Sequence, residues 1–461
     1  MHPLDDVITA IATPTGEGGI AVIRLSGEQA FRIADCCFRG KKPLADSQTH
    51  TAHFGTFVNE KRERVDDVVA TVFRSPHSYT GENSVELSCH GGVFVARTIV
   101  ETLIRAGARQ AEPGEFTKRA FLNGRMDLSQ AEAVADLIHA QSDAAQKLSL
   151  SQLHGRLSHK IDELREKLLG VCGLLELELD FVEEGISIVS QSQVSERLNS
   201  VVQEIDSMIK SYRAGRMSRE GVSVAIIGEP NVGKSSIFNN LIDYNRAIVT
   251  PVAGTTRDSI EENAIIDGVL FKLVDTAGIR PTTDIVESEG IKRTYSAIEE
   301  ADIILFVRDS TRIDEEIFLN ELRNLHSANA KIVEVLNKYD LIGFLQDRLP
   351  DIHRGMARVP LSAKTGFGLE QLRKALVEST DLQGVVDSDE SVMVTNFRHV
   401  ACLGNAKKAL DSALASLLQC VGNELVASDI RRGISDLEMI VGRVTSDDIL
   451  NHIFSKFCIG K

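Results

Sequence analysis

One short motif constrains this chain more than any other feature of its sequence. The apolar run from Val222 to Ile227 leads directly into Gly228-Glu229-Pro230-Asn231-Val232-Gly233-Lys234-Ser235, which fits the pattern G-x-x-x-x-G-K-[S/T]. A glycine-rich turn between a buried strand and a helix lets main-chain N–H groups point at phosphates, and the helix N-terminus adds positive potential. We therefore expect a phosphate-binding loop in which Lys234 reaches the outer phosphates and Ser235, next to Ser236, supplies a hydroxyl to Mg²⁺.

Two further motifs follow at the positions where a nucleotide-binding domain places its switch segments. Thr255 and Thr256 lie in Ala253-Gly254-Thr255-Thr256-Arg257-Asp258, where a threonine hydroxyl can complete the magnesium shell. The apolar run Leu270 to Val274 is followed by Asp275-Thr276-Ala277-Gly278. Its aspartate can contact Mg²⁺ through water, and its glycine N–H can sense the γ-phosphate.

The last two motifs select the base. Asn337-Lys338-Tyr339-Asp340 follows the apolar run Ile332 to Leu336, and the carboxylate of its aspartate can accept hydrogen bonds from N1–H and the exocyclic amine of guanine. Adenine offers no matching donors. Ser362-Ala363-Lys364, after Val359 to Leu361, resembles the final base-contacting element of such domains. A glycine-rich turn by itself explains only the first of these five motifs, so the series predicts a Ras-like domain that binds GTP and GDP with Mg²⁺ and hydrolyses GTP.

One position departs from the Ras pattern. Ile279 stands where Ras-type enzymes have a water-orienting glutamine, and no arginine finger can be assigned from the sequence. Charge in the transition state must then be met by a partner, a loop residue or an additional cation. The Asn231 side chain suits a cation ligand and equally suits a simple turn. Acidic side chains shortly after Gly278 are candidates to steer water, or else belong to an exposed loop: Asp284, Glu287 and Glu289.

Composition limits the class of protein and its partners. A chain of 461 residues suggests about two to four domains. Its net charge of −15 argues against nucleic-acid binding by bulk charge, so any RNA must meet a local basic patch. The seven cysteines include no C-x-x-C pair, which disfavours a disulfide framework or a zinc site. Since no apolar run approaches the ~20 residues of a membrane span, we expect a cytoplasmic protein without a membrane partner.

The pattern of apolar residues predicts a multi-domain fold that combines α+β and α/β parts. The first ~115 residues alternate β-like runs with a helical run from Val93 to Arg105, and later residues have helical periodicity. Arg213 to Gly221 is interpreted as a linker. The predicted order is an N-terminal α+β domain (1–117), the first part of a helical bundle (118–216), an inserted Ras-like domain (217–379) and the second part of the bundle (380–461), with helices from both sides of the insertion packing together.

The flanks of the inserted domain carry a more specific resemblance. They contain Ile11-Ala12-Thr13-Pro14, Gly18-Gly19-Ile20, Ile23-Arg24-Leu25-Ser26-Gly27, Tyr79-Thr80-Gly81-Glu82, His90-Gly91-Gly92, Pro113-Gly114-Glu115-Phe116, the run Arg119 to Glu132, and the tail Phe457-Cys458-Ile459-Gly460-Lys461. Together these segments resemble the family of tRNA modification GTPases known as MnmE or TrmE, and few other GTPases share such flanks.

The resemblance implies a fold, a reaction and a set of partners. It implies an N-terminal domain that forms a homodimer and binds 5-formyltetrahydrofolate or a related one-carbon folate, beside a discontinuous helical domain and a G domain. Members of this family act with the flavoprotein MnmG, which uses FAD and NADH, as an expected heterotetramer. They install a (carboxymethyl)aminomethyl group at C5 of the wobble uridine (position 34) of certain tRNAs, and GTP hydrolysis drives or gates that chemistry.

The resemblance also assigns residues. K⁺ takes the place of an arginine finger and is held by Asn231 with Thr250, Val252 and Thr255, in a switch loop that runs on through Pro251, Ala253 and Gly254 to Thr256 beside the nucleotide. The family's catalytic glutamate falls on Glu287. The folate pocket takes Arg24, Glu82, Arg125 and Lys461, with arginine at 125 where some relatives have lysine.

The C-terminal cysteine has three interpretations. Cys458-Ile459-Gly460-Lys461 ends in lysine and follows no polybasic stretch, which disfavours a prenylation signal. The family resemblance brings Cys458 near the folate, where a thiolate can act as a nucleophile. A frayed, inert C-terminus is the alternative.

Other functions were weighed for the whole chain. A ribosome-assembly or signalling GTPase shares the G domain, but a ribosome-assembly factor should carry a basic, aromatic RNA-binding module, and this chain is acidic and has no Trp. A free-standing one-carbon transferase would explain the folate-like flanks, but it would not explain the complete series of nucleotide-binding motifs.

Overall fold

The computed structural model describes residues 6–14, 16–180, 190–243, 261–275, 298–312, 330–343, 356–380, 382, 392–419 and 422–461. The chain divides into two compact units, each assembled from segments that are far apart in sequence. Unit 1 consists of Met1–Ala135, Gln152–Leu169 and Arg431–Lys461, and unit 2 consists of Asp136–Ser151 and Gly170–Ile430.

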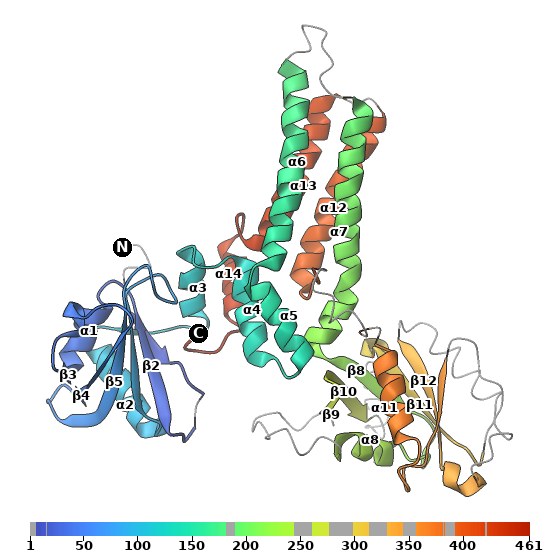
Figure 1. The fold of residues 1–461 in the computed structure, drawn as a ribbon, viewed down its shortest axis with the longest axis horizontal. Coiled ribbons are helices and arrows are strands. Elements are labelled where there is room, and N and C mark those ends of the chain that lie inside the picture. Colours follow the sequence, from blue (N-terminus) through green and yellow to red (C-terminus); the bar gives the residue numbers. More distant parts are fainter. Residues whose placement is uncertain are drawn as a thin grey trace, which may run out of the picture. The chain divides into compact units, whose positions relative to one another are not determined.

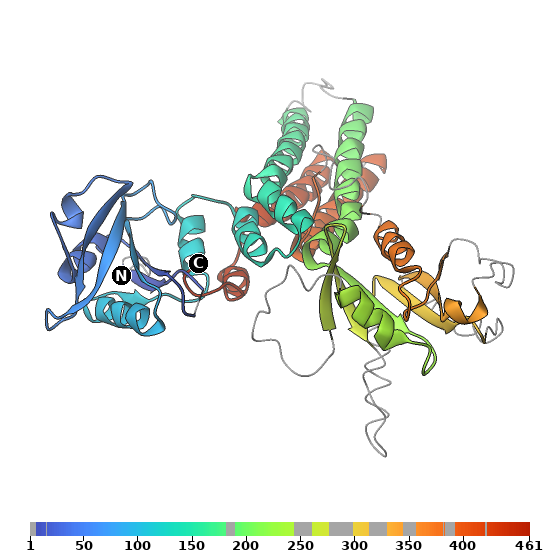
Figure 2. The ribbon, with the colours of Figure 1, turned by 60° about the horizontal axis from the view of Figure 1, so that its bottom comes forward.

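A seven-stranded sheet forms the N-terminal part of unit 1. Its strands lie in the order β3 (Phe38–Gly40), β4 (Thr51–Val58), β5 (Arg64–Phe73), β6 (Ser84–His90), β2 (Ile20–Ser26), β1 (Ile8–Ile11) and β7 (Arg109–Gln110). All neighbours are antiparallel except β1 and β7. Helices α1 (Ala30–Cys37) and α2 (Val93–Arg105) lie beside this sheet (Figure 1 and Figure 2). Both contribute buried side chains to one core with it. A short 3-10 turn, η1, spans Leu44–Asp46.

Helices from both ends of the chain complete unit 1. Helix α3 (Glu115–Leu122) leads to α4 (Leu128–His139), whose residues up to Ala135 belong to unit 1, and α14 (Asp447–Phe454) precedes the C-terminal tail. Helix α5 (Asp143–Leu153) lies mostly in unit 2. Apolar side chains of α4 and of the segment 450–457 share one core, which contains Leu128, Ala131, Leu450, Ile453, Phe454 and Phe457. The last residues of the chain are therefore packed against the segment that follows its N-terminal domain.

Unit 2 contains a six-stranded sheet with the order β13 (Ala357–Pro360), β12 (Lys331–Asn337), β11 (Ile303–Asp309), β8 (Val222–Ile227), β10 (Val269–Asp275) and β9 (Glu261–Ile266). Every neighbouring pair is parallel except β9 with β10. Helices α8 (Lys234–Asp243) and α11 (Leu369–Glu378) pack into one core with it (Figure 1), and the 3-10 turn η3 spans Tyr339–Ile342. In such sheets, ligands bind at the carboxyl ends of the strands.

Four long helices form the bundle: α6 (Arg156–Asp180), α7 (Gln191–Glu220), α12 (Phe397–Leu418) and α13 (Asn423–Val441). Helix α7 starts with a capping box in which Ser190 and Gln193 exchange hydrogen bonds. It runs beside α12 (Figure 1), and Lys407 Nζ donates to Asp206 Oδ1 at 2.7 Å across the pair. Arg165 of α6 likewise donates to Glu438 of α13 at 2.6 Å. Helices from before and after the inserted domain thus pack together, as predicted.

The predicted fold class is confirmed, and one local prediction is wrong. Arg213 to Glu220 is not a linker but the last part of α7, which ends at Glu220 with Gly221 as its C-terminal cap. The segment consists mostly of residues that tolerate a helix, and Gly215 is needed for packing: a Cβ there would lie 2.2 Å from the main-chain oxygen of Val394. Within the described residues, no helix is long and apolar enough to cross a bilayer.

Candidate functional site

Two glycines shape the loop between β8 and α8. Gly228 has φ +141°, and a Cβ there would lie 2.0 Å from the main-chain oxygen of Val307. Gly233 has φ +102°, and its Cβ would lie 2.2 Å from Asn337 Nδ2. Asn231 also adopts a positive φ of 63°. The loop therefore takes a curled path that other residues at 228 and 233 would obstruct, as a phosphate-binding loop requires.

Lys234 begins α8 and lies within the curl of this loop. Its side chain is 9% exposed, and Nζ donates to the main-chain oxygens of Gly228 and Glu229, both at 2.8 Å. The neighbouring Ser235 and Ser236 are exposed, as is Asn231. The ammonium group and the exposed hydroxyls thus lie at the carboxyl end of β8, where a triphosphate and its magnesium ion are expected.

Asn337 ties three loops together at the same edge of the sheet. Its Nδ2 donates to the main-chain oxygen of Val232 at 2.7 Å, and its Oδ1 accepts from the main-chain N–H of Ala363 at 3.0 Å. Asn240 of α8 adds a further link, because its Nδ2 donates to the main-chain oxygen of Ala363 at 2.8 Å. The phosphate loop and the two base-selecting motifs therefore form one assembly.

The carboxylate expected to read guanine is already oriented. Ser362 Oγ donates to Asp340 Oδ1 at 2.6 Å. Lys338, with φ +61°, directs Nζ to Asp309 Oδ2 at 2.7 Å. Lys364 is exposed beside this group. Asp340 thus has one oxygen held by a serine hydroxyl while the neighbouring lysine is held by a second carboxylate.

Sequence reasoning missed Asp309. Burial raises the pKa of this carboxyl, but hydrogen bonds from Lys338 and Thr311 lower it more, so the pKa lies below its usual value. Asp309 is the last residue of β11, which pairs with β8 and β12. A polar residue that ends a buried strand was the available signal, because the carboxyl ends of parallel strands meet at one edge.

Several predicted site residues have no described geometry. Asp275 ends β10 opposite Ile226 of β8, which puts its main chain at the same edge, and its side chain is not described. The switch segment Thr250, Pro251, Val252, Ala253, Gly254, Thr255 and Thr256 lies outside the described residues, and so do Thr276, Ala277, Gly278 and Glu287.

A second group of predicted site residues lies in unit 1, around Arg24. Its Nε and Nη2 donate to Glu86 Oε1 at 2.9 and 2.8 Å, and its guanidinium lies 5.0 Å from the ring centre of Tyr79 and 5.6 Å from that of Phe116. Nη1 is buried, with no hydrogen-bond partner among the described residues. A buried donor of this kind suits an anionic or carbonyl-bearing ligand.

The C-terminal tail closes onto the same region. Gly460 has φ +97°, and a Cβ there would lie 2.2 Å from the main-chain oxygen of Ile11. Burial lowers the pKa of Lys461, Arg24 lowers it further, and Glu86 and Cys458 oppose the shift. Cys458 has an exposed side chain, while its main-chain oxygen accepts from Gly114 N at 3.4 Å. The tail is thus docked on the N-terminal domain and not frayed.

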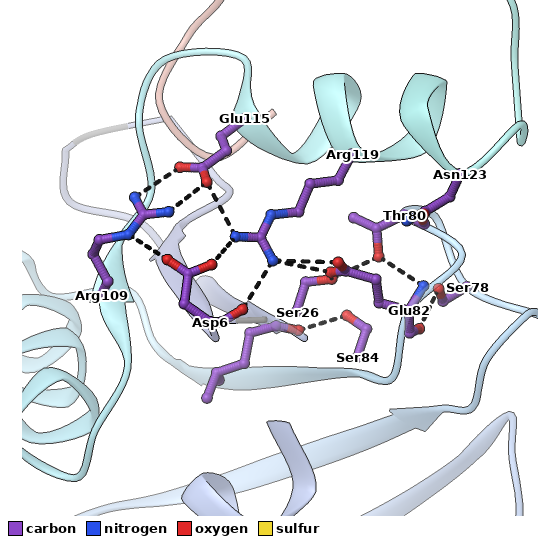
Figure 3. Close-up of polar contacts among 11 residues, drawn as sticks. Asp6, Ser26, Ser78, Thr80, Glu82, Ser84, Arg109, Glu115, Arg119 and Asn123 are labelled. Atoms are coloured by element: carbon purple, nitrogen blue, oxygen red, sulfur yellow. Dashed lines mark hydrogen bonds and ion pairs between the residues drawn. The ribbon is translucent and has the colours of Figure 1, made fainter. Parts of the chain in front are cut away.

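Glu82 lies in a polar network that includes Ser26 and Arg119 (Figure 3). Its Oε2 accepts from Ser26 Oγ at 2.7 Å, and its Oε1 accepts from Arg119 Nη1 at 3.2 Å. Arg125 is exposed and adjacent, since a Cβ on Gly81 would lie 3.2 Å from its Cγ. Arg119 was not assigned a role from sequence. The sequence feature that could have identified Arg119 is its charged side chain on the same helix as the buried side chains of Phe116 and Ala120.

Comparisons with known proteins identify the family of the chain. The family model described as "MnmE helical domain" matches residues 128–458, and that described as "GTP-binding protein TrmE N-terminus" matches residues 7–125. The tRNA modification GTPase MnmE of Christiangramia forsetii is 42% identical over 99% of this chain and 100% of its own. That of Acetivibrio thermocellus is 41% identical over 99% of both chains.

Among solved structures, the G domain of the T. maritima FeoB iron transporter aligns with 34% of this chain and 98% of its own, at 29% identity and a TM-score of 0.27. The matches to family models and full-length relatives cover both flanks and the region between them. This chain is therefore a GTP hydrolase, and it belongs to the tRNA modification GTPase MnmE family.

Proposed function

We propose that this GTPase acts with the flavoprotein MnmG to add a (carboxymethyl)aminomethyl group at C5 of the wobble uridine of certain tRNAs. The proposal rests on one observation: the chain combines a guanine-type nucleotide site in unit 2 with a cationic, aromatic-lined site in unit 1 that its own tail closes. A ribosome-assembly or signalling GTPase needs the first site and gives no reason for the second. The family match extends over both.

The nucleotide site is proposed to use K⁺ in GTP hydrolysis. Asn231, with Thr250, Val252 and Thr255, would hold the ion, while Ser235 and Thr256 would bind Mg²⁺. The positive φ and exposure of Asn231 support this role, because they put its side chain at the surface of the phosphate loop. A fixed monovalent cation can offset charge that develops between the phosphates. Glu287 would orient the attacking water.

The site in unit 1 is proposed to bind 5-formyltetrahydrofolate or a related folate, which supplies a one-carbon group when bound. The residues fit such a ligand, because Arg24 offers a buried Nη1 without a partner among the described residues and lies against two aromatic rings. Glu82 can accept hydrogen bonds from the ligand's N–H groups, and Arg125 and Lys461 can pair with its carboxylates. Cys458 is proposed to lie beside the bound ligand as a nucleophile.

We further propose a cytoplasmic homodimer, formed through the N-terminal domain, that joins MnmG in a heterotetramer and binds tRNA. The domain boundaries proposed for this assembly are those predicted from sequence: 1–117, 118–216, 217–379 and 380–461. Helix α7 continues past residue 216, so the boundary proposed between the helical domain and the G domain lies within a helix.

Nucleoside analysis of tRNA tests the proposal. Cells that lack this chain should lose the C5 substituent of the wobble uridine, and plasmid-borne wild type should restore it. A Lys234→Ala chain, which loses the ammonium of the phosphate loop, should fail to restore it although it accumulates normally. Unchanged wobble uridine in the deleted strain contradicts the proposed function.

Turnover in different salts tests the cation. GTP hydrolysis by the wild type should be faster in K⁺ than in Na⁺ at equal ionic strength, and Asn231→Ala should remove the difference. Equal rates of the wild type in both salts contradict a K⁺ site.

A further inference from the structure

Arg119 occupies the centre of the polar network in unit 1 (Figure 3). Its side chain is 1% exposed. Nη2 donates to Asp6 Oδ1 at 2.5 Å and to Glu115 Oε1 at 3.1 Å, and Nη1 donates to the main-chain oxygen of Asp6 at 2.9 Å. Contacts with Asp6 in the N-terminal segment and with Glu115 in its own helix thus hold the guanidinium in place, independently of its contact with Glu82.

The same guanidinium reaches Glu82. Arg119 Nη1 lies 3.2 Å from Glu82 Oε1 and 3.4 Å from Oε2. On the other side, Ser26 Oγ donates to Oε2 at 2.7 Å, and the Thr80 hydroxyl lies 2.6 Å from Ser26 Oγ. The main chain of Glu82 is held as well, because its oxygen accepts from Ser78 Oγ at 2.6 Å. Arg119 and Ser26 thus hold the Glu82 carboxylate in one orientation.

The two carboxylate oxygens are held unequally. Oε2 accepts from both Ser26 and Arg119, whereas the contacts found for Oε1 in the described residues consist of one long hydrogen bond from Arg119. An oxygen with one long contact keeps accepting capacity for a ligand donor. The polar network as a whole has a net negative charge, because it contains three carboxylates and two guanidinium groups. These belong to Asp6, Glu82, Glu115, Arg109 and Arg119.

We propose that Arg119 is a positioning residue of the folate site: it orients the Glu82 carboxylate so that Oε1 accepts a hydrogen bond from an N–H group of the ligand. This inference rests on the proposed folate binding. Arg119 does not itself contact the ligand, because it is buried behind Glu82. A planar guanidinium suits this role, since it donates to several carboxylates at once in fixed directions, which the single ammonium of a lysine cannot match.

A double-mutant cycle on the full chain separates positioning from general structural support. Calorimetric titration with 5-formyltetrahydrofolate is carried out on wild type, Arg119→Gln, Glu82→Gln and the double variant. If Arg119 acts through Glu82, Arg119→Gln should raise Kd at least about tenfold in the wild-type background and at most about threefold in the Glu82→Gln background. Equal costs in both backgrounds overturn the proposal, because a structural residue weakens binding whether or not Glu82 is present.

Arg109→Gln is the matched control. Arg109 donates to Asp6 Oδ2 at 2.7 Å and to Glu115 Oε1 at 2.6 Å, so it belongs to the same network without contacting Glu82. Its Kd should stay within about threefold of wild type. A tenfold loss in Arg109→Gln assigns the effect to the network as a whole and overturns the specific role of Arg119.

Failure of this inference can be told apart from misfolding of the variant and from failure of the proposed folate site. If circular dichroism shows that Arg119→Gln does not fold, Arg119→Lys takes its place in the cycle with the same criteria, because it keeps the buried charge and loses the planar fork. A wild type that gives no heat with the folate overturns the folate site and this inference together. A wild type that binds, with additive costs in the cycle, overturns this inference alone.

Discussion

Asn337 and Val232 lie 105 positions apart in sequence and are joined by a 2.7 Å hydrogen bond from the Asn337 side-chain amide to the main-chain oxygen of Val232. The loop that reads the base therefore supports the loop that binds phosphates. Asn337 is buried, so this hydrogen bond is shielded from water.

Removal of this link should weaken nucleotide binding. Asn337→Ala leaves the Val232 oxygen and the Ala363 N–H without their partner, at a cost of about 1–3 kcal/mol for each unsatisfied buried group. We expect GDP affinity to fall by about ten- to a hundredfold, measured with a fluorescent nucleotide. Asn240→Ala is the control, since Asn240 donates to the Ala363 loop and the hydrogen bond found for it does not involve the phosphate loop. An equal loss in both variants contradicts the special role of the link.

A change at Asp340 should alter base selectivity. Asp340→Asn replaces one accepting oxygen with an amide that donates, which matches the C2 carbonyl of xanthine better than the amine of guanine. GDP affinity should fall by at least about a hundredfold while affinity for xanthosine diphosphate rises. Competition titrations with both nucleotides give the ratio, and an unchanged preference for GDP shows that Asp340 does not read the base.

Glu287 should affect turnover and leave binding intact. Glu287→Ala is expected to lower kcat for GTP by about a hundredfold, the scale of a group that orients water or transfers a proton. The KM for GTP should change little. Glu289→Ala is the nearby control and should keep turnover close to wild type. Loss of GTP binding in Glu287→Ala indicates a structural role instead.

The network around Arg109 should respond to acid. Burial raises the pKa of Asp6 and of Glu115 and is the largest single effect, but hydrogen bonds and charge from Arg109 and Arg119, with the Glu112 N–H at Glu115, together outweigh it, so both lie below their ordinary values of 3.8 and 4.5. Such carboxyls stabilise the fold above their unfolded pKa values and lose this contribution as the pH falls through the lowered ones. Arg109→Gln should therefore lower Tm at pH 7 and have little effect well below pH 3.8.

The size of that effect should be modest. The Arg109 side chain is 43% exposed, and water screens pairs of this kind to about 1 kcal/mol or less. Thermal unfolding of wild type and Arg109→Gln, followed by circular dichroism at the two pH values, measures the difference. A Tm difference that stays the same in acid argues against carboxylates as its source.

Thiol reactivity should separate the cysteines. Burial raises the pKa of Cys37 and of Cys89 to about 11, so neither carries appreciable thiolate at neutral pH. Cys36 and Cys458 are exposed. Iodoacetamide at pH 8 should alkylate Cys458 and Cys36 before the buried Cys37 and Cys89, and the denatured chain should label at every cysteine. Peptide mass spectrometry gives the order; early labelling of Cys89 in the folded chain contradicts its burial.

Sequence patterns predicted the parts of the fold that depend on local periodicity. The helical run from Val93 to Arg105 is α2, and the apolar run Val222 to Ile227 is β8. The interpretation of Arg213 to Gly221 failed because Gly215, which suggests a break when seen alone, serves the close approach of Val394 from 179 positions along the chain. Propensity describes a residue's neighbours in sequence, whereas this contact depends on the tertiary fold.

The candidate sites divide in the same way. Lys234, Asn337 and Asp340 belong to contiguous motifs with fixed spacing, so their proximity was predictable. Asp309 and Arg119 act through partners in other elements, namely Lys338 on one side and Asp6 and Glu82 on the other. No spacing rule connects those positions. Their roles became visible only once the strands and helices were placed.

The packing of residues 450–457 against Leu128 and Ala131 orders events during synthesis. A ribosome that has made the first 135 residues has produced one side of this core and not the other. Unit 1 therefore matures only after translation has nearly finished, whereas the sheet of unit 2 can assemble while the chain is still growing. In a cell, a truncated product would thus retain the nucleotide-binding domain and the N-terminal sheet, whose core uses residues 7–108, but it would lack the core that joins Leu128 and Ala131 to residues 450–457.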